Sequence, residues 1–385
     1  MKKEKILIFI ANYLPGYKIG GPLNSVLNIT KNLKENCDFY IITSDRDMGD
    51  MTAYKNIETN KWINIDGSNI MYFKPGMIYY WNIYQHLKRN TYDVIYFNSL
   101  FEFKFSIFII FLNYFKLVKL NKIIVAPRGE LFEEALNFGK NKKHCFLKII
   151  NILRIYKNVT WHSTADIETV TINNNISNPK VKLAKVLADT SCTIFEIKEP
   201  DFNLQERNVL KIIFLSRISK EKNLIYALRI LKEVSCFVEF HIYGPKEDNI
   251  IWNECVDEIK LMPKNVIVKY KGNVEKKFVK SHFSKYDLFL FPTHLENYGH
   301  VINESLSVGT PVLLSDNTPW RSLEKKGWGW DFNLTNKESF INTIQRYAQQ
   351  SFNEKLIFRN EIVKSYVTQI NHDEVLKENI NLFKI

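Results

Sequence analysis

The sequence predicts an α/β protein made of two doubly wound halves, each built on a parallel sheet. Apolar runs of strand length alternate with amphipathic helical segments over the first 190 residues, and the alternation restarts at Val209. Residues 191–208, between the halves, are polar and show no sustained period. We therefore expect an N-terminal domain over 1–190, a linker over 191–208 and a C-terminal domain over 209–365. The last segment, 366–385, is expected to be a helix that packs back on the N-terminal domain.

Each half begins with an apolar strand that runs through a loop into a helix. In the first half we predict a helix over 24–34 and another over 102–115. The polar stretch up to about residue 70 shows little pattern. The predicted strands are 5–10, 39–43, 94–97, 122–126 and 159–162 in the first half, and 209–215, 239–243, 266–270, 287–291 and 312–314 in the second.

Composition indicates a globular protein of a reducing compartment. Of the 385 residues, 45% are apolar and 24% charged, an ordinary balance for a packed core. The five cysteines are odd in number, and no two have metal-ligand spacing. We recognise no signal peptide, and no stretch approaches the roughly 20 apolar residues of a membrane span. We therefore expect a cytoplasmic protein without a bound metal.

The net charge of +12 belongs mainly to the first half. Residues 1–190 hold 26 Lys and Arg against 16 Asp and Glu, an excess of ten, whereas residues 191–385 hold 27 against 25, an excess of two. The excess is densest around Lys140, Lys142, Lys143 and Lys148. Such a patch suits the inner face of an anionic membrane or a diphosphate-bearing lipid, and the alternative is a solvated face. No nucleic-acid motif accompanies the charge, so we expect no nucleic-acid partner.

Two glutamates, Glu296 and Glu304, stand eight positions apart where a buried strand meets a loop and a helix. Ligands of open α/β sheets bind at the carboxyl ends of the strands, so both carboxylates are expected at a ligand edge. A carboxylate accepts hydrogen bonds from two neighbouring hydroxyls, as on a ribose or a hexose, and a helix start favours an anion. Polyol and phosphate together indicate a nucleotide sugar. The alternative is an ordinary loop glutamate and a first-turn glutamate.

Cations and glycines flank two other strand ends. Arg217 and Lys222 border the turn SRISKEKN between an apolar strand and a helix, which suits a diphosphate, although solvated loop cations are common. Gly20 and Gly21 come just before a helix in the first half, where they would let backbone approach a phosphate or would simply form a turn.

Taken together, these motifs resemble the retaining glycosyltransferases of family four. That family has the GT-B fold, in which two Rossmann-like domains face each other across a cleft. The two glutamates of the family, followed by Gly-Thr-Pro-Val, match ENYGHVINESLSVGTPVLLSD, its Arg/Lys loop matches SRISKEKN, and its glycine loop matches IGGPLN. The segments APRGEL and TPWRSLEKKGWGW resemble a bacterial subgroup that builds polysaccharides.

The resemblance implies a retaining, metal-independent hexosyltransferase of cell-surface polysaccharide biosynthesis that needs no cofactor. Its donor would be a nucleotide diphosphate sugar, and its acceptor a glycan or a lipid-diphosphate-linked saccharide. Arg217 and Lys222 would neutralise the leaving diphosphate, and Glu296 would hold the donor sugar. The other residues assigned to the donor are Gly20, Gly21, Asn297, Tyr298, Gly299 and Glu304, the last of them to the ribose.

One departure from the family concerns the first half. Many members place a histidine after the strand that corresponds to 122–126, whereas this chain has Pro-Arg-Gly-Glu there. Arg128 would then contact the leaving group or the acceptor, and the alternative is a structural salt bridge. His294, close to Glu296, would touch the donor, and His162 is expected to be a packed residue.

Other functions on the same fold remain open at this stage. A sugar-nucleotide epimerase or a phosphorylase shares the two-domain plan, and a non-catalytic carbohydrate-binding relative would keep the fold without the chemistry. The glutamate pair and the Arg/Lys loop occur together here, which favours the transferase.

Overall fold

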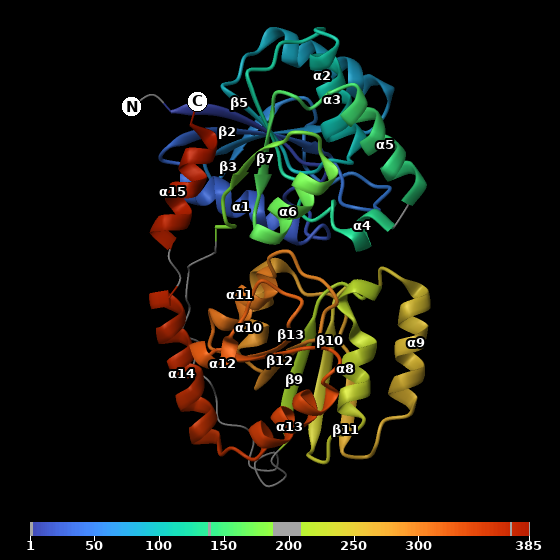
Figure 1. The fold of residues 1–385 in the computed structure, drawn as a ribbon, viewed down its shortest axis with the longest axis vertical. Helices are drawn as coiled ribbons and strands as arrows, with labels where there is room; N and C mark the ends of the chain where they lie inside the picture. Colours follow the sequence, from blue (N-terminus) through green and yellow to red (C-terminus); the bar gives the residue numbers. More distant parts are fainter. Residues whose placement is uncertain (1–2, 138–139, 188–208, 370–371, 385) are drawn as a thin grey trace. The chain divides into compact units, whose positions relative to one another are not determined.

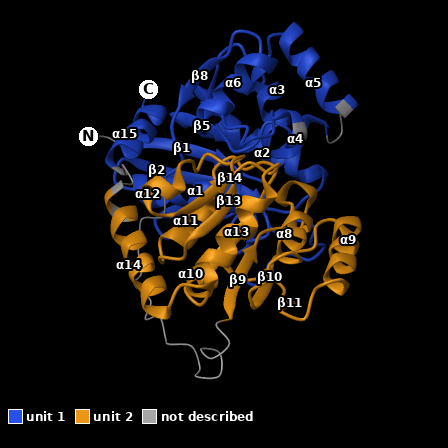
Figure 2. Cartoon of the chain, turned by 60° about the horizontal axis from the view of Figure 1, so that its bottom comes forward, with its two compact units in different colours: residues 1–187, 372–385 blue, residues 188–371 orange. Residues whose placement is uncertain are grey.

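The computed structural model describes residues 3–137, 140–187, 209–369 and 372–384. The chain divides into two compact units, Met1–Leu187 with His372–Ile385 and Ala188–Asn371, which Figure 2 colours separately. The expected linker, 191–208, lies outside the described residues. The expected start of the last segment at residue 366 falls inside helix α14, Phe352–Gln369, and helix α15, His372–Phe383, belongs to the first unit.

The first unit is built on an eight-stranded sheet in the order β3-β4-β2-β1-β5-β6-β7-β8, parallel except for the edge hairpin of β3 and β4. Alternate residues of the central strand β1 lie in different core clusters, Leu7 and Phe9 on one face and Ile6 and Ile8 on the other. Both faces are therefore covered, as a parallel sheet requires. The strands are β1 Glu4–Phe9, β2 Cys37–Ser44, β3 Trp62–Ile65, β4 Ser68–Phe73, β5 Val94–Phe97, β6 Lys122–Val125, β7 Val159–Ser163 and β8 Lys180–Leu183.

Helices cover both faces of this sheet, as Figure 1 shows. The last helix, α15, belongs to this layer, because Leu382 and Phe383 are buried in the same cluster as Ile8. Lys122 donates to the carbonyl of Leu382 at 2.6 Å and so caps the end of α15. The helices are α1 Gly21–Leu33, α2 Met77–Arg89, the π-helix η1 Phe103–Ile107, α3 Phe108–Tyr114, α4 Glu133–Asn137, α5 Lys140–Ile152 and α6 Asp166–Asn175.

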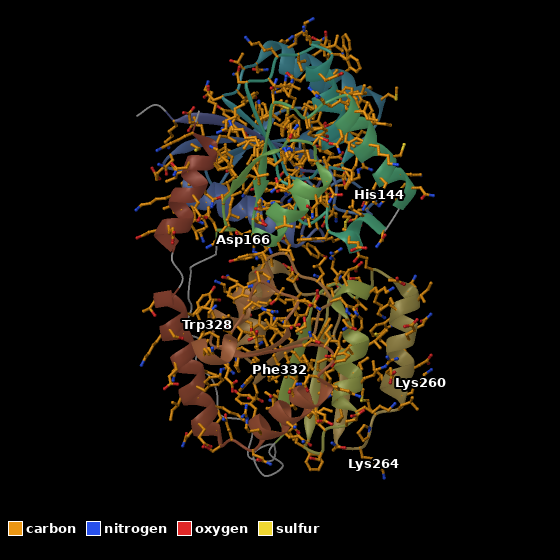
Figure 3. All side chains as sticks on the ribbon, viewed as in Figure 1. His144, Asp166, Lys260, Lys264, Trp328 and Phe332 are labelled. Atoms are coloured by element: carbon orange, nitrogen blue, oxygen red, sulfur yellow. The ribbon has the colours of Figure 1, made fainter. Side chains whose placement is uncertain are left out.

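The second unit has a parallel six-stranded sheet in the order β11-β10-β9-β12-β13-β14. In chain order this is 3-2-1-4-5-6, the doubly wound arrangement, and the parallel strands of the first unit follow the same order. The strands are β9 Leu210–Leu215, β10 Val238–Tyr243, β11 Val266–Tyr270, β12 Leu288–Phe291, β13 Val312–Ser315 and β14 Gly329–Phe332. Figure 3 labels Trp328, just before the edge strand β14, and Phe332, its last residue.

Two helical layers cover the second sheet. Helix α8 contacts α9 and α13, whereas α11 contacts α10 and α14. The guanidinium of Arg359, in α14, is buried and donates to the carbonyls of Tyr286 and Ser284, which fastens this helix under the sheet. The elements are η2 Lys220–Lys222, α8 Leu224–Leu231, α9 Asn249–Lys260, η3 Lys276–Phe278, α10 Val279–Phe283, α11 His300–Leu306, α12 Leu323–Lys326 and α13 Lys337–Ala348.

These findings confirm the predicted fold class of two parallel-sheet α/β domains. Each sheet also has a switch point, between β1 and β5 in the first unit and between β9 and β12 in the second, where the chain leaves toward opposite sides. Ligands of such sheets bind beyond the carboxyl ends of the strands at that point. No helix among the described residues combines the length and the apolar character needed to cross a bilayer.

Candidate functional site

The switch point of the second unit brings together the two motifs that the sequence singled out. The loop after β9 carries Arg217 and Lys222, and the loop after β12 carries Glu296. Because β9 and β12 are adjacent parallel strands, both loops leave the same edge of the sheet. The side chains of Lys222 and Glu296 meet there.

Lys222 and Glu296 form the centre of this site. The Nζ of Lys222 donates to Oε2 of Glu296 at 2.9 Å, and their side chains are only 13% and 16% exposed. The ammonium also lies 5.6 Å from the ring centroid of Phe291, the last residue of β12. The other oxygen of Glu296 accepts from the backbone N–H of Asn297 at 3.1 Å. A largely dehydrated pair of this kind offers a cation for a phosphate and a carboxylate for a hydroxyl at neighbouring positions.

The two loops are fastened to each other through their backbones. Asn223 adopts a left-handed conformation (φ 56°), and its side-chain amide donates to the carbonyl of Pro292 at 2.9 Å. The hydroxyl of Thr293 and the backbone N–H of His294 both donate to the carbonyl of Glu221, at 2.8 and 2.7 Å. His294 is exposed beside Glu296, so the structure brings it to the expected loop. This fastening fixes Lys222 opposite Glu296.

Glu304 lies deeper than Glu296, on α11. Its side chain is 6% exposed and forms an ion pair with Lys276, whose side chain is 43% exposed. Gly299 precedes the helix in the left-handed region (φ 81°), and a Cβ there would come within 2.6 Å of Ile302 and 3.2 Å of the Glu296 side chain. Only glycine therefore allows the chain to turn between the two glutamates.

Arg217 occupies the outer part of the site. Its guanidinium pairs with Glu247 at 2.6 Å, and both side chains are about two-fifths exposed. Its loop is held against the end of β10, where a Cβ on Gly244 would lie 1.8 Å from the carbonyl oxygen of Ser216. Because the pair is exposed, water and salt screen it, and an incoming anion can displace Glu247 at little cost.

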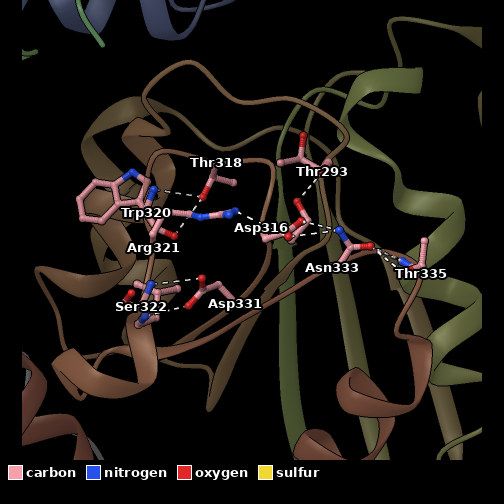
Figure 4. A network of polar contacts seen from close by, with 11 residues as sticks. Thr293, Asp316, Thr318, Trp320, Arg321, Ser322, Asp331, Asn333 and Thr335 are labelled. Atoms are coloured by element: carbon pink, nitrogen blue, oxygen red, sulfur yellow. Dashed lines mark hydrogen bonds and ion pairs between the residues drawn. The ribbon is translucent and has the colours of Figure 1, made fainter. Parts of the chain in front are cut away.

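A polar network behind the site braces the loop that carries Glu296. Figure 4 shows Asp316, just after β13, accepting from the amide of Asn333 at 3.2 Å, and Asp331 accepting from the backbone of Ser322 at the same distance. The loop held in this way supplies the carbonyl of Asn317, which accepts from the backbone N–H of Glu296 at 3.2 Å. The TPWRSLEKKGWGW segment thus supports the loop that carries Glu296 from behind.

Aromatic rings close one side of the same loop. The indole N–H of Trp320 donates to the carbonyl of Tyr298, and the two ring centroids are 5.8 Å apart. Tyr298 also packs edge-on against His300 at 4.8 Å. Asn297, Tyr298 and Gly299 therefore form a shaped backbone turn beside Glu296.

The candidate residues of the first unit gather at its own switch point. Gly20 has a φ of 66° and open space around the position of a Cβ, and Gly21 begins α1. Asn98, after β5, donates from its side chain to the carbonyl of Pro22 at 3.1 Å and accepts from Nε of Arg128 at 2.9 Å. The glycine loop and Arg128 are thus connected through Asn98.

Arg128 forms no salt bridge with the carboxylates that the structure describes. Its Nη2 donates instead to the hydroxyl of Tyr96 at 2.7 Å, and that hydroxyl donates to Nδ1 of His162 at 2.8 Å. Nε2 of His162 then donates to the carbonyl of Ala184 at 2.8 Å. Burial, together with the nearby Arg128 charge, lowers the pKa of His162 to about 3, so the imidazole is neutral. The expectation of a packed His162 is confirmed.

Three partners of the site were not foreseen: Glu247, Lys276 and Asn317. Each lies 21 to 30 residues from the residue that it contacts. The sequence contained no local signal for them, because the folding of separate βα units brings them together. Among the described residues there is no group of three or more His, Cys, Asp or Glu side chains arranged to hold a metal ion.

Comparison with solved structures shows that the fold is that of the GT-B glycosyltransferases. HepE of Anabaena in complex with UDP-glucose has a TM-score of 0.70 at 13% identity, covering 98% of this chain and 99% of that one. An E. coli protein bound with UDP-2-fluoro glucose, described as trehalose-6-phosphate, has a TM-score of 0.68 at 11% identity, with 99% of both chains covered. WaaG, a glycosyltransferase involved in lipopolysaccharide biosynthesis, has a TM-score of 0.63 at 11% identity, covering 98% of this chain and 99% of its own.

Sequence comparison adds a family match and one relative. The model of the family Glycosyl transferases group 1 matches residues 196–363, a range that contains Arg217, Lys222, Glu296 and Glu304. A Klebsiella pneumoniae protein, described as an uncharacterized 41.2 kDa protein in the cps region, is 24% identical over 343 residues, which are 87% of this chain and 89% of that protein. The family match and the fold together support a glycosyltransferase.

Proposed function

We propose that this protein is a retaining glycosyltransferase that moves a sugar from a nucleotide diphosphate sugar to a saccharide acceptor in cell-surface polysaccharide biosynthesis. The observation that carries the proposal is the Lys222–Glu296 pair at the switch point of the second unit, within the range of the family match. The pair supplies both a cation for the diphosphate and an acceptor for sugar hydroxyls. An epimerase, a phosphorylase or a binding relative does not account for the family match as directly.

The proposed roles follow the position of each residue. Lys222 and Arg217 stabilise the negative charge that grows on the diphosphate as the glycosidic bond breaks, a task that needs no metal ion. Glu296, relieved of Lys222 by the phosphate, accepts hydrogen bonds from the donor sugar. Glu304, which is deeper, accepts from the ribose, and the turn 297–299 presents backbone groups to the sugar. Gly20 and Gly21 offer backbone N–H groups to the phosphate, and His294 touches the donor.

The proposed donor is supported by structural neighbours that hold UDP-glucose and a fluorinated analogue of it. A thermal-shift screen of the full chain against UDP-, GDP-, ADP- and TDP-sugars tests this directly. The correct donor should raise the melting temperature, because a ligand that binds only the folded state stabilises it by mass action. If none of these nucleotides changes the melting temperature at millimolar concentration, the donor assignment is wrong.

We also propose that the protein works in the cytoplasm, with its first unit resting on an anionic membrane that presents a lipid-diphosphate-linked acceptor. Lys142 and Lys148 of α5 are exposed, whereas Lys143 turns inward and donates to the carbonyl of Ala135 at 2.6 Å. Figure 3 labels His144 on this helix. The end of α5 adds exposed apolar side chains to these lysines: Ile149, Ile152 and Leu153.

The end of α3 extends this surface. The hydroxyl of Tyr114 donates to the carbonyl of Leu153 at 3.2 Å, so the exposed Phe115 lies on the same side as the end of α5. Basic and apolar side chains together suit an anionic interface. Ile152→Ser should weaken co-sedimentation with vesicles containing phosphatidylglycerol, whereas Ile250→Ser, an equally exposed change in the second unit, should not. Equal retention of both variants would refute the contact.

A further inference from the structure

The Arg128 side chain is a cation of the first unit that has only neutral partners. Its guanidinium is partly buried and donates to the amide oxygen of Asn98 and to the hydroxyl of Tyr96, at 2.9 and 2.7 Å. A guanidinium has five N–H donors, and the remaining ones have no partner among the residues that the structure describes. The side chain is only partly buried, and none of its nitrogens is among the buried, unsatisfied atoms of the described residues, so these donors can reach an incoming group.

Two carboxylates of the same region, Glu130 and Glu168, are held by neutral donors. Glu130 accepts from the hydroxyl of Ser99 at 2.7 Å and from the backbone N–H of Leu100 at 2.6 Å. Glu168, which is fully buried, accepts from the backbone N–H groups of Gly129 and Thr164, both at 2.7 Å. Among the described residues neither carboxylate forms an ion pair with Arg128, although Glu130 lies two residues further along the chain and Glu168, in α6, accepts from the backbone N–H of the next residue. The hydrogen bonds that Arg128 makes in this network therefore all go to neutral acceptors.

The backbone at Arg128 is held in a conformation that a side chain of this kind rarely adopts. Arg128 has a φ of 53° and Gly129 a φ of 83°, so two successive residues are left-handed. Such a conformation costs free energy and persists only where the surroundings impose it, which is common at ligand sites. Here Glu168 imposes it by accepting from the N–H of Gly129.

Tyr96 and His162 fix the direction of the guanidinium without neutralising it. The neutral imidazole donates to Ala184 and accepts from the Tyr96 hydroxyl, whose oxygen is then left to accept from Arg128. In this series of hydrogen bonds, from Ala184 through His162 and Tyr96 to Arg128, each donor has one acceptor. Arg128 is therefore oriented by a buried framework. Preorganised donors of this kind bind a charged ligand without further ordering.

The start of α1 lies beside the same framework. The side-chain amide of Asn98 donates to the carbonyl of Pro22, in the first turn of this 13-residue helix. The helix begins after Gly20 without a side-chain cap, so its first N–H groups are left for another acceptor. One asparagine thus bonds both to the arginine and to the uncapped helix start.

We propose that the first unit carries an oxyanion-binding site, in which Arg128, oriented by Tyr96 and Asn98, binds a phosphate or carboxylate group beside the start of α1. The site would recognise the negatively charged oxygen atoms that phosphate and carboxylate groups share. It rests on the proposed glycosyltransferase function only for the source of the oxyanion, which is the diphosphate of the donor or an acidic group of the acceptor.

Hydrogen–deuterium exchange of the full chain with inorganic pyrophosphate tests the site without any sugar transfer. In the wild type, pyrophosphate should slow exchange in the segments 20–25 and 126–131 of the first unit. Arg128→Gln should abolish this protection or require on the order of tenfold more pyrophosphate, since charged hydrogen bonds are lost. Each variant is compared with its own probe-free state, so a change in basal stability does not affect the comparison.

Arg154→Gln is the matched control. Arg154 is also a left-handed arginine of the first unit (φ 49°), but it is exposed at the end of α5 and lies outside this framework. In the Arg154→Gln variant, pyrophosphate should slow hydrogen exchange as much as in the wild type. Tyr96→Phe keeps the charge of Arg128 but removes the hydroxyl that orients it, so this variant should show intermediate protection. Protection of the 126–131 segment in Arg128→Gln equal to that in the wild type, or none in the wild type, would overturn the proposal.

Calorimetry with UDP identifies the source of the oxyanion. If Arg128→Gln binds UDP more weakly than the wild type does, the oxyanion is the diphosphate of the donor. If the affinity for UDP is unchanged while pyrophosphate protection of 126–131 is lost, the oxyanion belongs to the acceptor. Failure of every sugar nucleotide in the thermal-shift screen would refute the proposed function and leave the exchange result valid.

Discussion

The two units share a strand order but differ in the state of their cations. In the second unit Lys222, Arg217 and Lys276 each pair with a carboxylate at the switch point. In the first unit Arg128 has only neutral acceptors. The same topology therefore places charged groups at the same kind of edge, while the local partners decide whether a charge is already neutralised.

This difference gives each unit its own mode of binding. In the proposed function, a diphosphate that binds the second unit would replace Glu296 on Lys222, and the released carboxylate would become available to a hydroxyl. Binding there would exchange one partner for another, and we therefore expect it to favour ligands that carry both phosphate and hydroxyl groups. Binding at Arg128 requires no such exchange, and an oxyanion alone is sufficient.

The largest expected effect on stability comes from a substitution in α15 and should be confined to the first unit. Phe383 is fully buried against Tyr96, with ring centroids 5.6 Å apart, so Phe383→Ala should cost about 3–5 kcal/mol of unfolding free energy in the first unit. Urea unfolding followed by hydrogen exchange should locate this loss in the first unit. Phe237→Ala, at a half-exposed position of the second unit, is the control, and a similar loss in both variants would contradict the assignment of α15 to the first core.

The second prediction removes the carboxylate from the paired site. Glu296→Gln keeps the shape of the side chain but loses the charge that faces Lys222 and the donor, so turnover should fall about 10²–10³-fold. Release of free nucleotide from the donor that the thermal-shift screen identifies would measure this. Glu275→Gln, an exposed change near Lys276, should retain activity, and normal turnover in Glu296→Gln would exclude its proposed role.

The third prediction concerns acid and affects the first unit. Burial lowers the pKa of His162 from its ordinary 6.5 to about 3, so below pH 6.5 the unfolded chain binds a proton that the folded chain refuses. The stability that the neutral His162 contributes to the folded state is fully present above pH 6.5. As the pH falls below 6.5, the free energy of unfolding decreases by about 1.4 kcal/mol per pH unit, so that roughly 2 kcal/mol has been lost at pH 5. Urea unfolding at pH 7.5 and 5.0 measures the loss, which His162→Gln should reduce. An equal pH dependence in the variant would contradict this cause.

The smallest effect concerns the exposed pair of the second unit. Glu247→Ala releases Arg217, and because the pair is screened by solvent, stability should change by no more than about 1 kcal/mol. Affinity for UDP should rise by about two- to fivefold, since the phosphate no longer competes with a carboxylate. Calorimetry of wild type and variant provides the comparison, and weaker binding would show that Glu247 supports the ligand.

The sequence was sufficient to predict the central strands, because strands covered on both faces appear as apolar runs. It was not sufficient for the hairpin of β3 and β4, because β3 is the edge strand and its alternate side chains are exposed. A signal was nevertheless present: Asp66 and Gly67, both left-handed, form a two-residue turn between the strands, and Asp-Gly favours such hairpins.

The site was predictable in its positions but not in its pairings. Arg217, Lys222 and Glu296 follow strand ends that meet at the switch point, which strand order alone requires. Their partners Glu247 and Asn317 follow other strands, and only the packed loops bring them into contact. For Arg128 the sequence suggested a salt bridge as an alternative, and it could not show that Glu130 and Glu168 are turned to neutral donors.

The most direct test of the account compares Lys222→Ala with Lys220→Ala. Both lysines belong to η2, but Lys222 is packed between Glu296 and Phe291, whereas Lys220 is exposed. Turnover of the donor identified by the thermal-shift screen should fall about 10²–10³-fold in Lys222→Ala and remain near the wild-type value in Lys220→Ala. Equal turnover in the two variants, with the fold intact, would contradict the central role of the Lys222–Glu296 pair.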